Sequence, residues 1–191
     1  MKGNAKEILK PTLILVIICL VVTAGLAFTN AATKSAIAAQ AENDAKQSRL
    51  MALPGADAFK KTDAKAVSDK VVDCYAGSKG GQTIGWVITT KSNSYGGDIQ
   101  VMTGISKAGK ITGVELVTTS DTPGLGLNAK KDTFRAQYQQ KVPEKGFEVV
   151  KGGGAKEGQI NALTGATITS KAVTSAVNEA VKQYEQVKGG E

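Results

Sequence analysis

The hydrophobic pattern begins with one long apolar run near the N-terminus. No charged residue occurs in residues 11–33, which is close to the roughly 20 apolar residues that a helix needs to cross a bilayer. Lysines precede this run at Lys2, Lys6 and Lys10. Because positive residues flanking a span favour the cytoplasmic side, we predict a cytoplasmic N-terminus over residues 1–10. The remainder of the chain is then expected on the outer side, periplasmic or extracellular.

A cleaved signal peptide is the alternative interpretation, since residues 36–38 offer the small residues of a cleavage site. The apolar run is long for a signal core, which favours an uncleaved single-pass anchor in the cell membrane. Residues 34–55 are rich in alanine and charged side chains, and they predict a helical stalk. We expect Pro54 and Gly55 to end this helix.

Short runs of alternating apolar and polar residues predict strands in the region that follows. A charged segment at residues 60–70 predicts instead a loop or a short helix. A glycine-containing turn at residues 107–110 joins two alternating runs and predicts a hairpin. The expected strands are residues 71–77, 81–91, 98–106, 111–120 and 147–154.

Helical spacing of apolar residues predicts two helices. Residues 170–188 carry valines every four positions with alanines beside them, which is the pattern of a helix with one buried face. Residues 131–141 place Phe134 and Tyr138 four positions apart, which also favours a helix. The fold class is therefore α+β: a mainly antiparallel sheet flanked by helices in an outer domain of residues 56–191.

Composition narrows the possible chemistry. The chain has no histidine and only two cysteines, Cys19 and Cys74, which argues against haem, iron–sulfur and structural zinc sites. We expect no disulfide between them, because they lie in different environments, and no metal site. The formal net charge is +7, but the lysines are scattered and aromatics are few, so no nucleic-acid partner is predicted. Any redox chemistry must come from an organic cofactor.

The stretch TGATITS, residues 164–170, carries several hydroxyls directly before the long predicted helix. One interpretation is structural: Thr169 or Ser170 caps the helix and Gly165 makes the preceding turn. The other is functional, because a helix N-terminus attracts phosphate. Small residues there let a ligand approach the backbone, and a hydroxyl could be esterified to its phosphate.

The stretch DTPGLG, residues 121–126, is by itself a turn, since Pro123 and its glycines suit one. Leu125 and Leu127 are unusual in a merely solvated loop. They are consistent either with a turn that buries two leucines or with a loop that covers the flat face of a ring.

Together, these two motifs in this order behind one membrane segment resemble the FMN-binding domain family. Within it, the chain is similar to the G subunits of the Rnf-type ferredoxin:NAD oxidoreductase complexes, relatives of the C subunits of the sodium-translocating NADH:quinone reductases. The resemblance implies FMN linked covalently, by a phosphoester, to Thr169. The matching core of the attachment motif is Thr164, Gly165, Ala166 and Thr167.

The resemblance also implies contacts outside the attachment motif. Asp121, Thr122 and the backbone from Gly124 through Leu125 to Gly126 would contact the ring or the ribityl chain. Residues 95–97, beginning with Tyr95, would form another wall. The chain departs from the family pattern at two positions, with Asn161 in place of an acid and Asp121 in place of glutamate. Removing the hydroxyl of Thr169 would then abolish attachment, and removing that of Thr164 would weaken it.

The implied role is electron transfer in a membrane-bound, ion-translocating oxidoreductase complex. Its partners would be the other membrane and iron–sulfur subunits, a flavin-attaching transferase for maturation, and the lipid bilayer. Two alternatives stay open: a stand-alone membrane-anchored flavinylated electron carrier, and a non-redox anchored binding or scaffold domain.

Overall fold

A computed structural model describes residues 5–189 of the chain, with side chains from residue 8 onward. Residues 1–4, including Lys2 of the predicted cytoplasmic segment, lie outside the described residues. The chain divides into two compact units, Met1–Asp44 and Ala45–Glu191.

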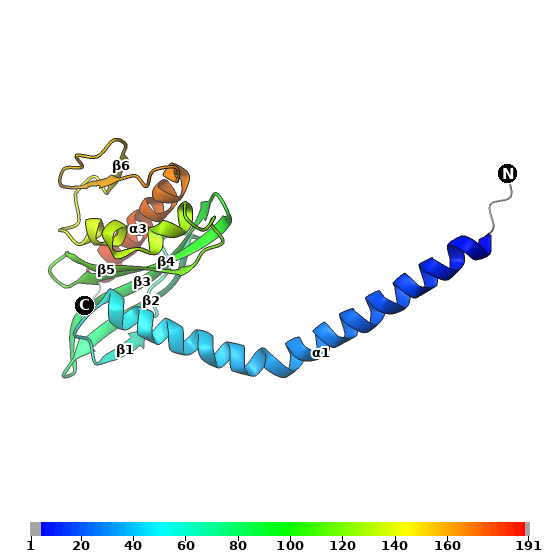
Figure 1. Cartoon of the computed structure of the whole chain (residues 1–191). Coiled ribbons are helices and arrows are strands. Elements are labelled where there is room, and N and C mark those ends of the chain that lie inside the picture. The colour runs from blue at the N-terminus through cyan, green and yellow to red at the C-terminus, as the bar shows by residue number, and fades with distance from the viewer. Residues whose placement is uncertain (1–4, 190–191) are drawn as a thin grey trace. The chain divides into compact units, whose positions relative to one another are not determined.

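A single helix, α1 (Ala5–Ala52), holds both the apolar run and the predicted stalk (Figure 1). Its segment from Ile8 is long and apolar enough to cross a membrane, with a mean hydropathy of 2.7 and none of its most apolar stretch buried. The helix continues from the apolar run through residues 34–52 of the predicted stalk. The helix ends just before Pro54, and Gly55 then adopts a positive φ of 92°, which favours glycine.

The second unit, residues 45–191, is built on a five-stranded sheet in the order β1-β2-β3-β4-β5, with every neighbouring pair antiparallel. The α+β prediction is confirmed. Residues 62–70 form a loop, as expected, whereas the edge strand at residues 58–61 was not predicted. The strands are β1 (Ala58–Lys61), β2 (Val71–Lys79), β3 (Gln82–Ser94), β4 (Gly97–Ser106) and β5 (Ile111–Thr118).

The middle of β3 is buried on both faces. Alternate residues such as Trp86 and Ile88 join the main core with α3 (Thr167–Val187), while Val87 joins a second cluster with Ala52 at the end of α1. Helix α3 buries the face predicted from its valine and alanine spacing. The sheet is thus covered on both sides. This explains why the middle of β3 has consecutive apolar residues and no alternation with polar ones.

Two glycines let the end of α1 lie directly on the sheet. Gly104 and Gly113 are paired across β4 and β5. A Cβ added at Gly104 would lie 2.0 Å from the carbonyl oxygen of Ala52, and one at Gly113 would lie 2.7 Å from that of Met51. The Thr112 hydroxyl donates to the Ala52 carbonyl at 2.5 Å. This hydrogen bond holds the backbone at the end of α1 against the two glycines.

The segment predicted as a helix over residues 131–141 is broken into short turns, which is a correction. Phe134 and Tyr138 are nevertheless both buried, with ring centroids 5.8 Å apart in an edge-to-face contact. The elements are η1 (Gly126–Lys130), α2 (Asp132–Arg135) and η2 (Ala136–Tyr138).

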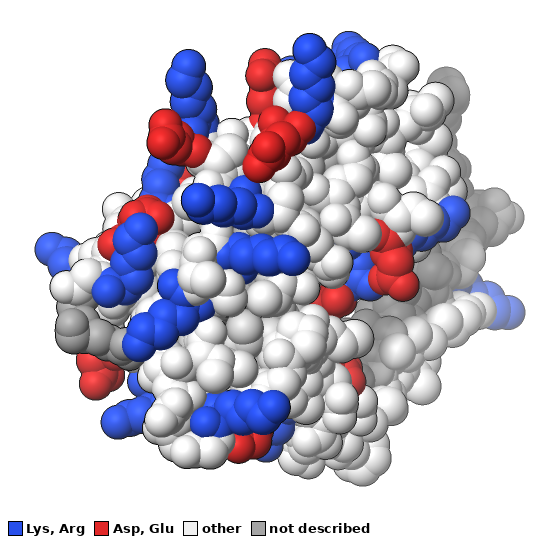
Figure 2. All heavy atoms as spheres, turned by 90° about the vertical axis from the view of Figure 1, so that its left-hand side faces the viewer, with Lys and Arg blue, Asp and Glu red and all other residues white. Residues whose placement is uncertain are grey.

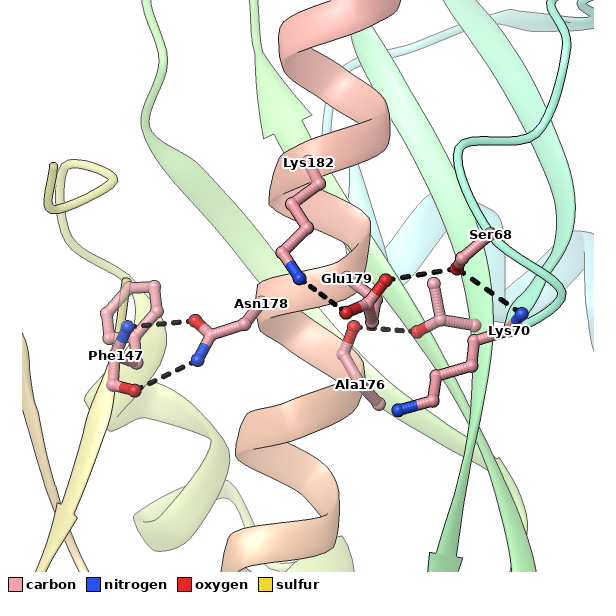
Figure 3. Close-up of polar contacts among 8 residues, drawn as sticks. Ser68, Lys70, Phe147, Ala176, Asn178, Glu179 and Lys182 are labelled. Carbon is pink, nitrogen blue, oxygen red and sulfur yellow. Dashed lines mark hydrogen bonds and ion pairs between the residues drawn. The ribbon is translucent and has the colours of Figure 1, made fainter. Parts of the chain in front are cut away.

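A second, two-stranded sheet follows, formed by β6 (Glu148–Val150) and β7 (Gln159–Asn161) in parallel. The first strand was predicted; the second was not. Helix α3 holds this part through the Asn178 amide, which accepts from the Phe147 N–H at 2.8 Å and donates to its carbonyl at 2.9 Å (Figure 3). The next residue, Glu179, accepts from the Ser68 hydroxyl at 3.0 Å and so connects α3 to the loop before β2.

The buried hydroxyl of Tyr138 provides a test of core packing. Tyr138 is fully buried and lies 2.7 Å from the Thr174 hydroxyl, which itself donates to the Ser170 carbonyl, so Tyr138 is the donor. We expect Tyr138→Phe to lower the free energy of unfolding by about 1 kcal/mol. Denaturant unfolding followed by the fluorescence of the single tryptophan measures it. Tyr95→Phe, at an exposed ring, is the control, and equal effects of the two would contradict this account.

Candidate functional site

Helix α3 begins without a side-chain cap. Its N-cap position is Ala166, and no side chain in the described part of the chain hydrogen-bonds there as a cap. The prediction that Thr169 or Ser170 caps the helix is therefore wrong, because both lie inside the first turn. Ser170 instead accepts from the Leu163 N–H at 2.9 Å and donates to the Ala166 carbonyl at 2.9 Å. The first N–H groups of the helix are left available to an anion.

This helix start forms one wall of a pocket of about 490 Å³. The pocket brings together the two motifs and the β3–β4 turn, which lie far apart in sequence. Thr164 and Gly124 are the two predicted site residues that do not line it, and both are exposed. The lining residues are Tyr95, Asp121, Thr122, Leu125, Gly126, Gly165, Ala166, Thr167, Ile168 and Thr169.

Asp121 holds the β3–β4 turn at the base of the pocket. The residue is 4% exposed. Its carboxylate accepts from the Ser94 hydroxyl at 2.6 Å and from the Gly96 N–H at 2.6 Å. The side chain predicted to touch the cofactor is thus largely occupied in holding this turn. Sequence reasoning placed residues 95–97 at the site but missed Ser94 and the hydrogen bond from Gly96, because nothing in the local pattern signals these contacts.

The hydrogen bonds also set the ionisation of Asp121. Burial opposes the charged form, but the donors Ser94, Gly96 and Thr169 together outweigh it, so the pKa of Asp121 lies below its ordinary value. A carboxyl with a lowered folded-state pKa adds stability above its unfolded pKa of about 4 and loses it as the pH falls through the folded-state pKa.

Acid sensitivity should therefore depend on this side chain. We expect Asp121→Asn to reduce the loss of stability between pH 7 and about pH 3, since it removes one carboxylate that must be protonated on unfolding. Urea midpoints at the two pH values measure the effect. The same pH dependence in both proteins would show that Asp121 is not held ionised in the folded state.

Thr169 is 1% exposed and lies under Gly126. A Cβ added at Gly126 would lie 2.6 Å from the Thr169 hydroxyl oxygen and 2.7 Å from the Asp121 Cβ. Only glycine therefore fits between the loop and this hydroxyl. Gly165, with a φ of 75°, makes the turn into the helix, and a Cβ there would lie 3.1 Å from Leu125.

The mouth of the pocket is apolar and exposed. Tyr95 is 74% exposed, Ile168 is 57% exposed and Leu125 is 46% exposed, although all three are large hydrophobic side chains. They come from the β3–β4 turn, the start of α3 and the DTPGLG loop, and we call them the apolar rim. Ile168 was missed by sequence analysis, although its place between two motif threonines was a usable signal. Leu127 is partly buried and does not line the pocket.

Asn161, which replaces an acid of the family pattern, lies outside the pocket lining. Its side-chain oxygen accepts from the Ala155 N–H at 3.1 Å, and its own N–H donates to Gln137 at 2.7 Å. The side chain thus fastens the loop before the attachment motif. An aspartate could accept the same hydrogen bond, so the local structure requires an acceptor rather than a charge.

The two cysteines and the metal-ligating side chains of residues 8–189 form no second candidate site. Among the described residues there is no group of three or more metal-ligating side chains. Cys74 is buried in the main core, where burial raises the pKa of its thiol, and Cys19 is exposed on α1; both are free thiols. On the face shown in Figure 2, basic side chains are interspersed with acidic ones.

The chain is similar to known proteins in both sequence and fold. Residues 94–182 match the FMN-binding domain family, and residues 1–51 match the RnfG N-terminal region. The G subunit of the proton-translocating ferredoxin:NAD(+) oxidoreductase complex of Clostridium ljungdahlii is 40% identical over 82% of this chain and 80% of its own. The G subunit of the Na(+)-translocating ferredoxin:NAD(+) oxidoreductase complex of Acetobacterium woodii is 36% identical over 95% of this chain and 94% of its own.

Among solved structures, the fold is similar to that of NqrC from Shewanella oneidensis. The TM-score is 0.55 and the identity 19%, over 75% of this chain and 74% of that one. The C subunit of the Na(+)-translocating NADH-quinone reductase from Parabacteroides distasonis gives a TM-score of 0.52 at 18% identity, over 68% of this chain and 72% of its own. At such identities the likeness concerns the fold.

Proposed function

Because the chain belongs to the RnfG family of FMN-binding subunits of ion-translocating ferredoxin:NAD oxidoreductases, we propose that it carries FMN covalently on Thr169 as an electron-transfer subunit. The observation that carries this proposal is the uncapped start of α3 beside a buried threonine hydroxyl, inside a pocket made by both family motifs. The phosphate, the ring and the covalent bond each have a counterpart among the residues of this pocket.

The residues at the start of α3 fit a phosphate. The first-turn N–H groups have no side-chain cap, and the helix dipole favours an anion there. Gly165 and Ala166 allow close approach to the backbone, and Thr167 adds a partly exposed hydroxyl. An ester to Thr169 would fix the phosphate without a lysine or arginine, and none lines this pocket.

The apolar rim fits the ring of the flavin. Tyr95, Leu125 and Ile168 are exposed to solvent in the protein alone, so covering them with a flat apolar surface is favourable. The pocket volume of about 490 Å³ is within the range of cofactor sites. When bound, FMN supplies the transfer of electrons, and the protein supplies its position and electrostatic environment.

The covalent bond would keep the FMN attached to the protein. Much of the rim is open to solvent, so non-covalent contact alone would hold the cofactor weakly. Lysines before the apolar part of α1 favour a cytoplasmic N-terminus, which would set the FMN domain on the outer side of the membrane. We further propose that the chain works within a complex of membrane and iron–sulfur subunits, after modification by a flavin-attaching transferase.

The test is the intact mass of the protein purified from its native membrane, followed by peptide mapping. We expect a mass increase equal to one FMN minus water, located on the peptide that contains Thr169. The associated subunits should co-purify if the chain acts in a complex. A modified chain that purifies alone would point to a stand-alone flavinylated carrier. An unmodified Thr169 in every molecule would leave only an anchored binding or scaffold domain.

A further inference from the structure

We propose that residues 122–128 form a lid that closes over the Thr169 hydroxyl and has to open before this hydroxyl can be modified. This inference rests on the proposed function, because it concerns how the attachment point becomes accessible. The structure has the lid closed, since Thr169 is 1% exposed while the apolar rim of the same pocket is open to solvent.

The covering contact is made by the main chain of Gly126. A Cβ added there would lie 2.6 Å from the Thr169 hydroxyl oxygen, so the glycine backbone occupies the space next to this oxygen. Water hardly reaches Thr169 in this arrangement. The phosphoryl group of a flavin nucleotide is larger than water and cannot reach the oxygen until Gly126 moves away.

The lid is held together by its own hydrogen bonds. The N–H groups of Leu125 and Leu127 both donate to the Thr122 carbonyl at 3.2 Å. The Asn128 side-chain amide donates to the Gly124 carbonyl at 2.6 Å. Within residues 8–189, no hydrogen bond connects the lid to α3 or to the turn before it. The lid can therefore move away from Thr169 as a unit without breaking a hydrogen bond to that helix.

Both ends of the lid are fixed, which confines the movement to the segment between them. Asp121, directly before it, accepts two hydrogen bonds of 2.6 Å from the end of β3 and the β3–β4 turn. Ala129, directly after it, is fully buried in the main core. Gly124 has a φ of 78° and an added Cβ would meet no atom within 4 Å, so the backbone can rotate there. Leu125 is already half-exposed, so opening uncovers little more apolar surface.

Opening is then a step of maturation. The transferase presents a flavin dinucleotide to the open form, the Thr169 oxygen bonds to the phosphorus of the FMN half, and the bond from that phosphorus to AMP breaks. The hydroxyl proton is released to water or to AMP, and no atom changes oxidation state. With the lid closed, the same oxygen has no access to phosphorus.

The first measurement is the rate at which Thr169→Cys reacts with a small thiol reagent. It uses the unmodified full-length chain in detergent, with Cys19 and Cys74 replaced by alanine. Ile168→Cys in the same background is the exposed reference, and native Cys74, which is 5% exposed in the main core, is the buried one. We expect the thiol of Thr169→Cys to react at least about tenfold more slowly than that of Ile168→Cys. It should react at least about tenfold faster than Cys74, because local opening is more frequent than opening of the core.

A methyl group at Gly126 should hold the lid open. It would collide with the side chain at position 169 and with the Asp121 Cβ, which lies 2.7 Å from the added carbon. We expect Gly126→Ala to raise the labelling rate of Thr169→Cys by about tenfold. Gly189→Ala is the control, because its added carbon has no neighbour nearer than 3.9 Å.

The second measurement locks the lid. A Cβ at Gly165 would lie 3.1 Å from Leu125, so Leu125→Cys with Gly165→Cys places a disulfide between the lid and the turn before α3. We expect the oxidised chain to accept FMN, from the transferase and a flavin dinucleotide, at least about tenfold more slowly than the same chain after reduction. Gly165→Cys alone, which has the same strain at a φ of 75°, should show no such difference.

The outcomes separate this inference from the proposed function. If the wild type takes no flavin, the proposed function fails, and the thiol rates still decide whether the lid opens. If the wild type is modified and the oxidised chain reacts as fast as the reduced one, only the lid is overturned. A thiol of Thr169→Cys that reacts as slowly as Cys74, or as fast as that of Ile168→Cys, also overturns it. Should the disulfide not form or Gly126→Ala not fold, these thiol rates decide alone.

Discussion

Replacing Thr169 with valine is expected to abolish covalent attachment of FMN. Valine has nearly the same shape as threonine, and Thr169 is 1% exposed, so the change removes the hydroxyl while keeping most of the packing. Without an oxygen at this position no phosphoester can form. We expect intact mass of the chain, produced together with the transferase, to fall from fully modified to unmodified.

Two companion variants make this result specific to the hydroxyl. Thr169→Ser keeps an oxygen at the same place and should retain attachment. Thr164→Val alters a motif residue that is exposed and does not line the pocket. We therefore expect FMN attachment to persist in this variant, whereas the motif alone predicted weaker attachment. Full modification of Thr169→Val, mapped to Thr167, would show that the attachment point was assigned to the wrong residue.

Replacing Gly104 with alanine is expected to destabilise the unit of residues 45–191. The new methyl carbon would lie 2.0 Å from the Ala52 carbonyl oxygen, and this neighbour is backbone that is also held by Thr112. Overpacking a well-fitted site costs about 1–3 kcal/mol, and we expect the upper part of that range because a main-chain segment has to move. A domain of this size should then lose roughly 5–10 °C in Tm.

Thermal unfolding of the full-length chain in detergent, followed by tryptophan fluorescence, measures this change. Gly189→Ala is the matched control, because its nearest neighbouring atom lies 3.9 Å from an added Cβ and its φ is not positive. An unchanged Tm for Gly104→Ala would mean that the end of α1 does not pack on the glycine pair.

The sheet and the long helix were predictable because their signals are local and repeated. Ile99, Val101 and Thr103 alternate along β4 and share one face, as their spacing predicted. The segment around Phe134 was less predictable, because its two aromatic rings are buried by tertiary packing and not by a continuous helix. β7 has only three residues and pairs in parallel, so it carried too short a pattern to be recognised.

The candidate site was predictable where a motif marks it and not where tertiary contacts build it. The motifs located Thr169 and Asp121, which the structure brings together in one pocket, where both lie against Gly126. The β3–β4 turn was expected to contribute a wall at residues 95–97, with no contact to Asp121. Its closest approach is at Gly96, where an added Cβ would lie 2.3 Å from the Ser120 carbonyl oxygen. Such a requirement for glycine depends on a segment distant in sequence, and no local pattern reveals it.

Because the pocket is open on one side only, electrons would have to enter and leave the protein on that side. The apolar rim is open, whereas the opposite walls at Asp121, Gly126 and Thr169 are buried. Under the proposed function, a protein that delivers an electron and one that collects it would have to land on the same small opening. The two proteins would compete for this opening and would bind there one after the other. Turnover would then be limited by the dissociation rate of the protein that binds first. Weak, short-lived binding would therefore suit this protein better than tight binding.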